Sequence, residues 1–308
     1  LEDGRNAVLA LVVEAEGSTY VGAGAIALFA GEVRVGWLSG GCLESEIAAR
    51  AESAADSGCI EWMEIDTRDD ESLFGGSALG CRGRLRLALL PLRTLIGWID
   101  LAASWLSCSG PMEISLSSTG ELQCSVERKS ARWEVATSPP NWGSEIAPGM
   151  RWSVSIAAPP SVLVFGTGPE APILLPLLRA MGWMSTAAES RPRWQENAYL
   201  ADTLISDKPA RLAQSNLIGV HFAALVMHHN FELDLETLLV LAPTSIPFIG
   251  LLGPNRRRED LFRLLPESAV AALLPRLHSP VGMDLGGRGP EAIALSIAAQ
   301  LQARLHAR

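Results

Sequence analysis

A glycine-rich turn in the second half of the chain has the composition and context of a phosphate-binding site. It runs from Gly166 to Ala171, between an apolar segment typical of a strand and a segment typical of a helix. Small residues such as Gly166 and Gly168 let the backbone approach a pyrophosphate, whose charge then lies at the helix N-terminus. Glu189 follows 21 positions after Gly168, where an acidic residue can accept from a ribose hydroxyl. The pattern predicts nucleotide-like binding; the alternative is a tight turn without a ligand.

A cysteine near the start of the chain lies in a second candidate site. Ser39, Gly40 and Gly41 directly precede Cys42, and a helix is expected from Leu43 to Ser57. The free N–H groups and the macrodipole at a helix N-terminus favour a thiolate, and two glycines open the backbone to a ligand. The spacing therefore indicates a functional Cys42. The alternative is a small buried hydrophobe, which is the commoner role of cysteine.

Cys81 is the second glycine-flanked cysteine. It stands between Gly80 and Arg82, and Arg84 follows closely, so two arginines could lower the pKa of its thiol. The alternative is again a small buried hydrophobe. No Cys-x-x-Cys or close His–Cys pair is present, so the sequence does not favour a zinc site. The remaining cysteines lack such surroundings and are expected to be inert: Cys59, Cys108 and Cys124.

Further candidate residues follow expected strands of the second half. His228-His229-Asn230 comes after an apolar strand, and ligands of open α/β sheets bind outside the carboxyl ends of strands. His229 and Asn230 are therefore candidate cleft residues, and a hydrogen-bonded turn is the alternative. The run Arg256–Arg258 could bind phosphate, although charge runs that open helices are usually solvated. The stretch Asp284–Pro290 before the last helix is either another anion-facing turn or a simple loop.

The elements that must position these residues alternate after Pro160. Strand–helix alternation of this kind implies a parallel, doubly wound α/β sheet. The expected strands are 161–165, 223–227 and 248–252, and the expected helices are 169–181, 235–241, 259–265 and 290–305.

The first half has a different pattern, with successive strands and one expected helix. A strand over 8–14, a hairpin of 25–29 with 33–37, and strands at 61–66 and 84–90 are expected around the helix 43–57. A Ser-rich, weakly alternating segment follows, with strands expected at 112–116 and 122–127. Pro159-Pro160 marks the boundary between a domain over 1–158 and one over 159–308.

Composition excludes several classes of protein. The chain has 308 residues, 48% of them hydrophobic and 19% charged, which is the composition of a globular protein and not of a disordered one. A net charge of −9 argues against general binding of nucleic acid or anionic membranes. The uncharged stretch Thr237–Asn255 contains three prolines and is expected to be a helix end, a loop and a strand, not a membrane span. With five cysteines and no signal-like start, the chain is expected to be cytoplasmic.

Taken together, these stretches resemble the XdhC/CoxI family, the accessory factors of xanthine dehydrogenase and carbon monoxide dehydrogenase. The resemblance runs in the family's order along essentially the whole chain. Its most specific parts are Gly40–Glu44, with the sequence Gly-Gly-Cys-Leu-Glu, and Ile249–Gly253, with the sequence Ile-Gly-Leu-Leu-Gly. Other matching stretches are Gly17–Thr19, Leu73–Gly75, Leu79–Cys81, Gly166–Ala171, Glu189–Pro192, His229-Asn230, Leu233–Leu235, Arg276–His278, Pro280–Gly286 and Pro290-Glu291.

The resemblance implies an N-terminal XdhC/CoxI domain, a C-terminal Rossmann-like domain and a role in maturation of the molybdenum cofactor. Such proteins bind the pterin cofactor while a cysteine desulfurase partner supplies the sulfido ligand, and then deliver it to the apo-dehydrogenase. On this reading Gly166–Ala171 holds the phosphate, His229 and Asn230 line the cleft, and Cys42 or Cys81 approaches the molybdenum.

The sequence departs from the usual family pattern at several positions. Tyr20-Val21 stand where Pro-Arg is common, and Pro169 stands where the turn often has His. Arg82 replaces a usual glycine, and Gln300 stands where an acidic residue is common. These departures are compatible with a different client or with a lost activity.

Two other functions are consistent with the same residues. One is an NAD(P)-dependent oxidoreductase that uses the glycine turn and Glu189, although no clear general acid–base pair for hydride chemistry is present. The other is a protein-binding adaptor whose Rossmann-like domain is vestigial. The apolar composition permits a homodimer under any of these readings.

Overall fold

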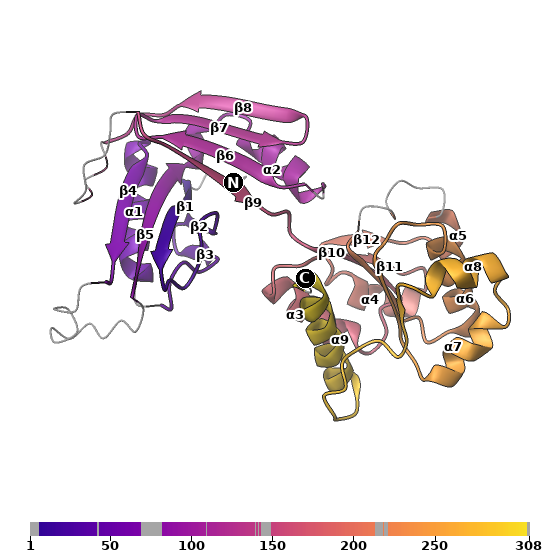
Figure 1. Cartoon of the computed structure of the whole chain (residues 1–308). Helices are drawn as coiled ribbons and strands as arrows, with labels where there is room; N and C mark the ends of the chain where they lie inside the picture. The colour runs from indigo at the N-terminus through magenta and orange to yellow at the C-terminus, as the bar shows by residue number, and fades with distance from the viewer. Residues whose placement is uncertain are drawn as a thin grey trace. The chain divides into compact units, whose positions relative to one another are not determined.

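The chain folds into two compact units, Leu1–Ala158 and Pro159–Arg308 (Figure 1). The computed structural model describes residues 6–41, 43–68, 82–108, 110–138, 140, 142, 149–212, 218 and 221–306. In this part of the chain, no helix combines the length and apolar character needed to cross a membrane.

The N-terminal unit contains two antiparallel sheets. The first has the strand order β3-β2-β1-β5-β4, and the second has the order β8-β7-β6-β9. The strands of the first sheet are β1 (Ala7–Gly17), β2 (Ile26–Ala30), β3 (Val33–Val35), β4 (Glu61–Asp66) and β5 (Gly83–Pro91). Those of the second are β6 (Met112–Ser117), β7 (Glu121–Val126), β8 (Lys129–Glu134) and β9 (Arg151–Ile156).

Strand β1 is buried on both faces, which explains its unbroken apolar run. Val8 and Val12 belong to the cluster that packs against helix α1 (Glu44–Ser57). Leu9 and Leu11 point to the other face, where the second sheet and helix α2 (Trp98–Leu106) form a separate core. Because side chains alternate along a strand, one strand can supply two cores only if every position is apolar.

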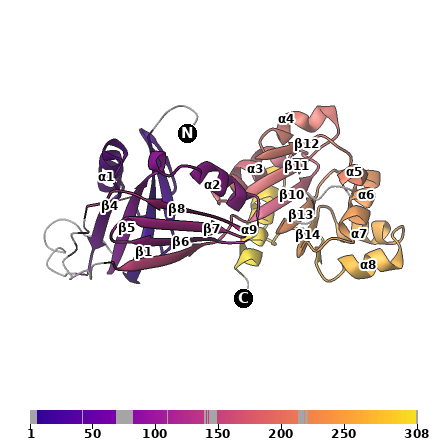
Figure 2. The same ribbon diagram turned by 90° about the horizontal axis from the view of Figure 1, so that it is seen from above.

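The C-terminal unit contains one parallel sheet with the order β12-β11-β10-β13-β14-β15, most of which can be followed in Figure 2. Its strands are β10 (Ser161–Phe165), β11 (Met184–Ala188), β12 (Thr203–Ile205), β13 (Ala223–Val226), β14 (Phe248–Leu251) and β15 (Leu277–His278). Its helices are α3 (Ala171–Ala180), α4 (Gln195–Ala198), α5 (Pro209–Leu212), α6 (Phe231–Leu241), α7 (Asn255–Phe262), α8 (Glu267–Leu273) and α9 (Pro290–Leu305).

Helices cover both faces of this sheet. Val162 and Val164 of β10 pack in a cluster with α3 and α9, whereas Leu163 and Phe165 pack in a cluster with α6, α7 and α8. Figure 1 shows the two sets of helices on opposite sides of the strands. The expected fold class, a doubly wound parallel sheet in the C-terminal part beside a mixed α/β N-terminal part, is confirmed.

Candidate functional site

The glycine turn packs against the loop that follows β13. Gly166 has a φ of +89°, and a Cβ there would lie 2.6 Å from the Cα of His228. A Cβ on Gly168 would lie 3.0 Å from Cδ2 of His229. Glycine is therefore required at Gly166 by both conformation and space. The close approach brings the predicted residues Gly166, Gly168 and His229 together at the carboxyl edge of the sheet.

A buried carboxylate and an amide fix the shape of this turn. Glu189 is fully buried and accepts hydrogen bonds from the backbone N–H of Thr167, at 3.0 Å, and from Arg191. Asn197 Nδ2 donates to the carbonyl oxygen of Thr167 at 2.9 Å. Burial alone would raise the pKa of Glu189, but the hydrogen bonds from Arg191 and Thr167 outweigh it and lower the pKa to about 2. The carboxylate is thus ionised and supplied with donors by the protein itself.

This arrangement bears on the ribose contact expected of Glu189. A ribose hydroxyl would have to displace Thr167 or Arg191 from the carboxylate, and either loss would leave a buried group without its partner. The geometry therefore favours a positioning role for Glu189, and its contact with a ribose stays a prediction. Arg191 extends the link, because its guanidinium also donates to the carbonyl oxygen of His228 at 2.8 Å.

His229 forms an ion pair with the turn. Its φ is +54°, which is unusual for a residue with a side chain, and its side chain is 48% exposed. Nε2 lies 3.0 Å from Oε2 of Glu170, a carboxylate that is nearly fully buried. The hydrogen bond with Glu170 raises the pKa of His229. Burial acts to raise the pKa of Glu170, but the hydrogen bond and charge of His229, together with a backbone hydrogen bond, outweigh it and lower that pKa. Both directions favour a protonated imidazole beside Gly168, which is suited to an anion.

Behind His229 lies a buried charge cluster that sequence reasoning did not identify as part of a site. Asp234 is 1% exposed and accepts from the backbone N–H of His228 and from the guanidinium of Arg257. Its Oδ1 also lies 3.2 Å from Nδ1 of His228. Arg257 belongs to the arginine run considered as a phosphate site; it is instead paired with Asp234, and Arg258 donates to the carbonyl oxygen of Ser279. The cluster fixes the backbone that carries His229.

Asn230 caps helix α6. Its side-chain oxygen accepts from the backbone N–H of Leu233 at 2.9 Å. This is the hydrogen-bonded turn that the sequence left open as the alternative to ligand binding. Ala171 is the first residue of α3 and is fully buried, so its small size serves packing against the sheet.

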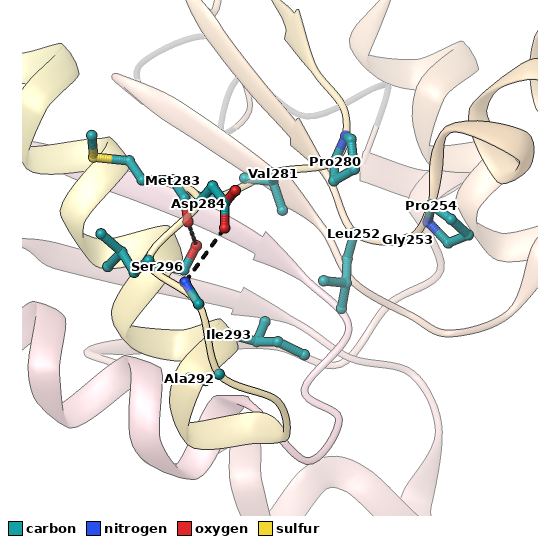
Figure 3. Close-up of a pocket in the computed structure, with 14 residues that line it drawn as sticks. Leu252, Gly253, Pro254, Pro280, Val281, Met283, Asp284, Ala292, Ile293 and Ser296 are labelled. Carbon is teal, nitrogen blue, oxygen red and sulfur yellow. Dashed lines mark hydrogen bonds between the residues drawn. The ribbon is translucent and has the colours of Figure 1, made fainter.

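A cavity of about 480 Å³ lies at the same edge of the sheet, beyond the end of β14 (Figure 3). Three stretches line it: 252–254 after β14, 280–287 after β15, and residues of the first turns of α9. Its volume falls within the usual range of small-molecule sites. Since β10, β13 and β14 are adjacent parallel strands, the turn and the cavity both lie at their carboxyl ends.

In the N-terminal unit, the loop before α1 is organised by Glu44. Its Oε1 accepts from the hydroxyl of Ser39 at 3.0 Å and from the backbone N–H groups of Leu38 and Ser39. Gly40 and Gly41 are exposed, and Gly41 has a φ of +105°. The geometry leaves the backbone of both glycines accessible. Cys42 and Cys81 lie outside the described residues, so their thiol roles and the molybdenum contact predicted for Cys42 stay predictions.

A larger hollow of about 650 Å³ lies beside α1 and the β2–β3 turn. Glu32, Glu52 and Asp56 are among the residues that line it. Three carboxylates disfavour a phosphate-bearing ligand, so the carboxyl edge of the C-terminal sheet is the better candidate for an anionic one.

Comparisons with known proteins agree with this architecture. A family model described as the XdhC Rossmann domain matches residues 162–301, and a model described as the XdhC and CoxI family matches residues 1–65. The chain belongs to the XdhC and CoxI family. The resemblance inferred from the motifs is thereby confirmed.

Among the relatives of this XdhC and CoxI family member is a probable xanthine dehydrogenase subunit of Bacillus subtilis (strain 168). It is 27% identical over 333 residues, which cover 98% of this chain and 94% of the relative. An uncharacterized protein of Escherichia coli (strain K12), YqeB, is 38% identical over 69 residues, or 22% of this chain and 13% of its own length. A crystal structure of a xanthine dehydrogenase from Bacillus halodurans has a TM-score of 0.71 and 26% identity, and covers 99% of this chain and 94% of that one.

The structure explains part of the XdhC and CoxI sequence pattern. Gly250, in the Ile-Gly-Leu-Leu-Gly stretch, lies where a Cβ would be 2.5 Å from Cγ2 of Val281. Gln300, a departure from the family pattern, accepts from the backbone N–H of Gly282 at 2.7 Å, a role that a carboxylate could also fill. This departure therefore preserves a hydrogen-bond acceptor beside the cavity.

Proposed function

We propose that the chain binds the molybdenum cofactor, holds it during sulfuration and delivers it to a xanthine dehydrogenase-type molybdoenzyme. The observation that carries the proposal is the juxtaposition, at one sheet edge, of a glycine turn beside His229, which is hydrogen-bonded to Glu170, and a cavity of about 480 Å³. A ligand that combines a phosphate with a ring system needs both features. Family membership supplies the link to xanthine dehydrogenase.

The residues present fit the phosphate end of this cargo. A Cβ at Gly168 would lie 3.0 Å from Cδ2 of His229 and 3.4 Å from Oε2 of Glu170, so the absence of a side chain lets the backbone of the turn approach both groups. The hydrogen bond with Glu170 raises the pKa of the imidazole, and the Glu170 carboxylate is itself turned toward it. A phosphate would then meet the imidazole of His229, since the backbone N–H groups of Ala171 and Ile173 already donate to the carbonyl oxygens of Gly168 and Glu170.

The residues proposed for the metal end are Cys42 and Cys81. The bound molybdenum centre supplies the redox chemistry of the client enzyme, and the chain's own part is to bind and shield it. A thiolate is a suitable soft ligand for this purpose. The accessible backbone of Gly40 and Gly41 beside Cys42 supports the assignment. Within the described residues, no group of three or more His, Cys, Asp or Glu side chains forms a metal site.

The partners proposed from family membership are the client molybdoenzyme and a cysteine desulfurase, with a homodimer as the assembly. On this view the chain turns nothing over itself. The rival function, an NAD(P)-dependent oxidoreductase, would need Glu189 to contact a ribose. The hydrogen bonds that Glu189 receives from Arg191 and Thr167 favour the carrier over this rival.

The test is retention of the cofactor. Purified full-length protein is mixed with freshly released molybdenum cofactor and desalted, and the bound pterin is measured by fluorescence after oxidation, with NAD run in parallel. We expect stoichiometric pterin and no NAD. His229→Ala should lower retention about tenfold, because a charge-assisted hydrogen bond is lost, whereas His306→Ala, at the exposed end of α9, should not.

Two further observations belong to the same experiment. Retention by the wild type should fall as the pH rises above 6.5 and through the raised pKa of His229, where the imidazole loses its charge. Cys42→Ala should lose cofactor while Cys59→Ala keeps it. Firm NAD binding without pterin would overturn the carrier function and favour the oxidoreductase.

A further inference from the structure

The cavity beyond β14 exists because small residues line one side of it. Ala292 and Ser296 are four positions apart on α9, so they lie on the same face of the helix. Opposite them the chain passes through Gly282, Gly286 and Gly287, all with positive φ. A Cβ on Gly287 would lie 3.0 Å from the Cβ of Ala292. Helix and loop thus meet closely at these points and leave a hollow between them.

The walls and the rim of the cavity differ in chemistry. Leu252, Val281 and Ile293 contribute apolar side chains, as Figure 3 shows. The rim carries one acidic side chain, Asp284, from the loop after β15. Apolar walls suit the faces of a flat ring, and a carboxylate at the edge suits N–H donors in the plane of that ring.

Asp284 has acceptor capacity to spare. Its Oδ1 accepts from the backbone N–H of Gly286 at 3.4 Å, which is long for an N–H···O bond. In the part of the chain that the structure describes, it takes part in no ion pair. An ionised carboxylate has about four lone-pair positions, so most of them are available to a ligand.

We propose that this cavity binds a planar heterocycle through a 2-amino-4-oxo-pyrimidine edge, with Asp284 as the acceptor. This edge presents two adjacent N–H donors, the ring N–H and the exocyclic amine, which match the two oxygens of one carboxylate. Adenine presents an amine beside a ring nitrogen acceptor, whose lone pair would face the carboxylate. The proposal deepens the proposed function and rests on it: the edge belongs to the pterin of the cofactor, and guanine shares it.

The position of the cavity agrees with a ligand anchored at the glycine turn. The turn follows β10, the cavity follows β14, and β13 lies between them in the parallel sheet. The other side of the turn, at the end of β11, is occupied by the salt bridge between Glu189 and Arg191. A ligand with its phosphate at the turn therefore has room for its ring on the β13–β14 side.

The test is a fluorescence titration of the full chain with a soluble pterin. Three compounds serve as competitors: the counterpart of this pterin with a 2-oxo group in place of the 2-amino group, GMP, and AMP. We expect the pterin to bind at least about tenfold more tightly than the 2-oxo counterpart or AMP. Asp284→Asn should weaken pterin binding by about tenfold to a hundredfold. Ala292→Trp should abolish it by filling the cavity.

The matched control is Glu291→Gln, which also removes one carboxylate charge, at the residue before Ala292 but outside the cavity lining. The affinity of this variant for the pterin should stay within about twofold of the wild-type value. If GMP competes with the pterin for wild type but not for Asp284→Asn, the cavity recognises the edge that guanine and pterin share. That result would assign the guanine of a dinucleotide form of the cofactor to the cavity. Binding of the pterin alone would assign the cavity to the pterin. Equal competition by AMP, or full affinity in both Asp284→Asn and Ala292→Trp, would overturn the proposal.

The outcome separates this inference from the proposed function. If wild type retains molybdenum cofactor after desalting and Asp284→Asn retains it equally, the carrier function stands and the cavity assignment fails. If wild type retains no cofactor but binds free pterin through Asp284, the cavity assignment stands and the carrier function fails.

Discussion

Glu189 shows how a single buried carboxylate can hold a functional turn in shape. It accepts hydrogen bonds from Thr167 in the turn and from Arg191. Arg191 in turn donates to the carbonyl oxygen of His228, in the loop that carries His229. Because its pKa is about 2 in the folded chain against an ordinary value of 4.5, the charged form stabilises the fold. The pKa is depressed, so this contribution is complete above pH 4.5 and is lost as the pH falls toward 2.

We therefore expect Glu189→Gln to lower the free energy of unfolding by about 3 kcal/mol at pH 7. The difference from wild type should shrink as the pH falls from 4.5 toward 2, because wild type loses the same contribution there. Urea unfolding at pH 7 and at pH 3.5 measures both values. Glu196→Gln, an exposed neighbour, should leave the midpoint unchanged at both. A constant difference at all pH values would contradict the assignment.

Residue types and spacing were enough to find the turn and His229, but not their partners. Gly166 and His229 follow apolar strands, and the carboxyl ends of parallel strands meet at one edge. Arg191 and Arg257 gave no comparable signal, since an arginine near a loop is usually solvated and its partner is chosen only in three dimensions. A carboxylate between two apolar residues, Leu233-Asp234-Leu235, was the one local hint of a buried charge.

At the scale of elements, the periodicity of apolar residues and the positions of proline and glycine predicted most of the architecture. The last helix begins at Pro290 and ends at Leu305 as expected, because proline fixes its first turn. Helix α7 begins at Asn255, not Glu259, since the arginine run continues the helix that Pro254 opens. Helix α2 was not predicted, because its apolar residues follow Gly97 without a polar cap. The cavity could not be predicted, since it depends on how closely α9 approaches a loop.

Strand β14 and the loop after β15 are packed too closely for any side chain at Gly250. A Cβ there would lie 2.5 Å from Cγ2 of Val281 and 2.8 Å from Cδ2 of Leu225. We expect Gly250→Ala to cost about 2 kcal/mol of stability through overpacking. Gly22 has open space around it, so Gly22→Ala should cost less than about 1 kcal/mol of stability, which is at most about half the cost of Gly250→Ala.

Thermal unfolding of the two variants measures this difference. Adding Val281→Ala to Gly250→Ala should recover part of the loss, because it removes the nearer of the two clashing groups. If Gly250→Ala unfolds at the wild-type temperature, the close packing of these two elements is refuted.

For the whole molecule, charge is divided unevenly between the two units. Residues 159–308 carry 13 Lys and Arg against 13 Asp and Glu, so the net charge of −9 lies in residues 1–158. The candidate anion site is thus in the neutral unit, where His229 is paired with the carboxylate of Glu170. The net charge of −9 still repels an anion at long range, over a Debye length of about 30 Å at 0.01 M salt.

The net negative charge predicts that the binding of a phosphate-bearing pterin depends on salt. The association rate should rise about twofold between 10 and 150 mM KCl, because screening shortens the Debye length to about 8 Å and removes the long-range repulsion. Stopped-flow fluorescence measures the rate, and a pterin without a phosphate should associate equally fast at both salt concentrations. A rate that falls with salt would mean that local cations, not the net negative charge of the chain, control the approach of the ligand.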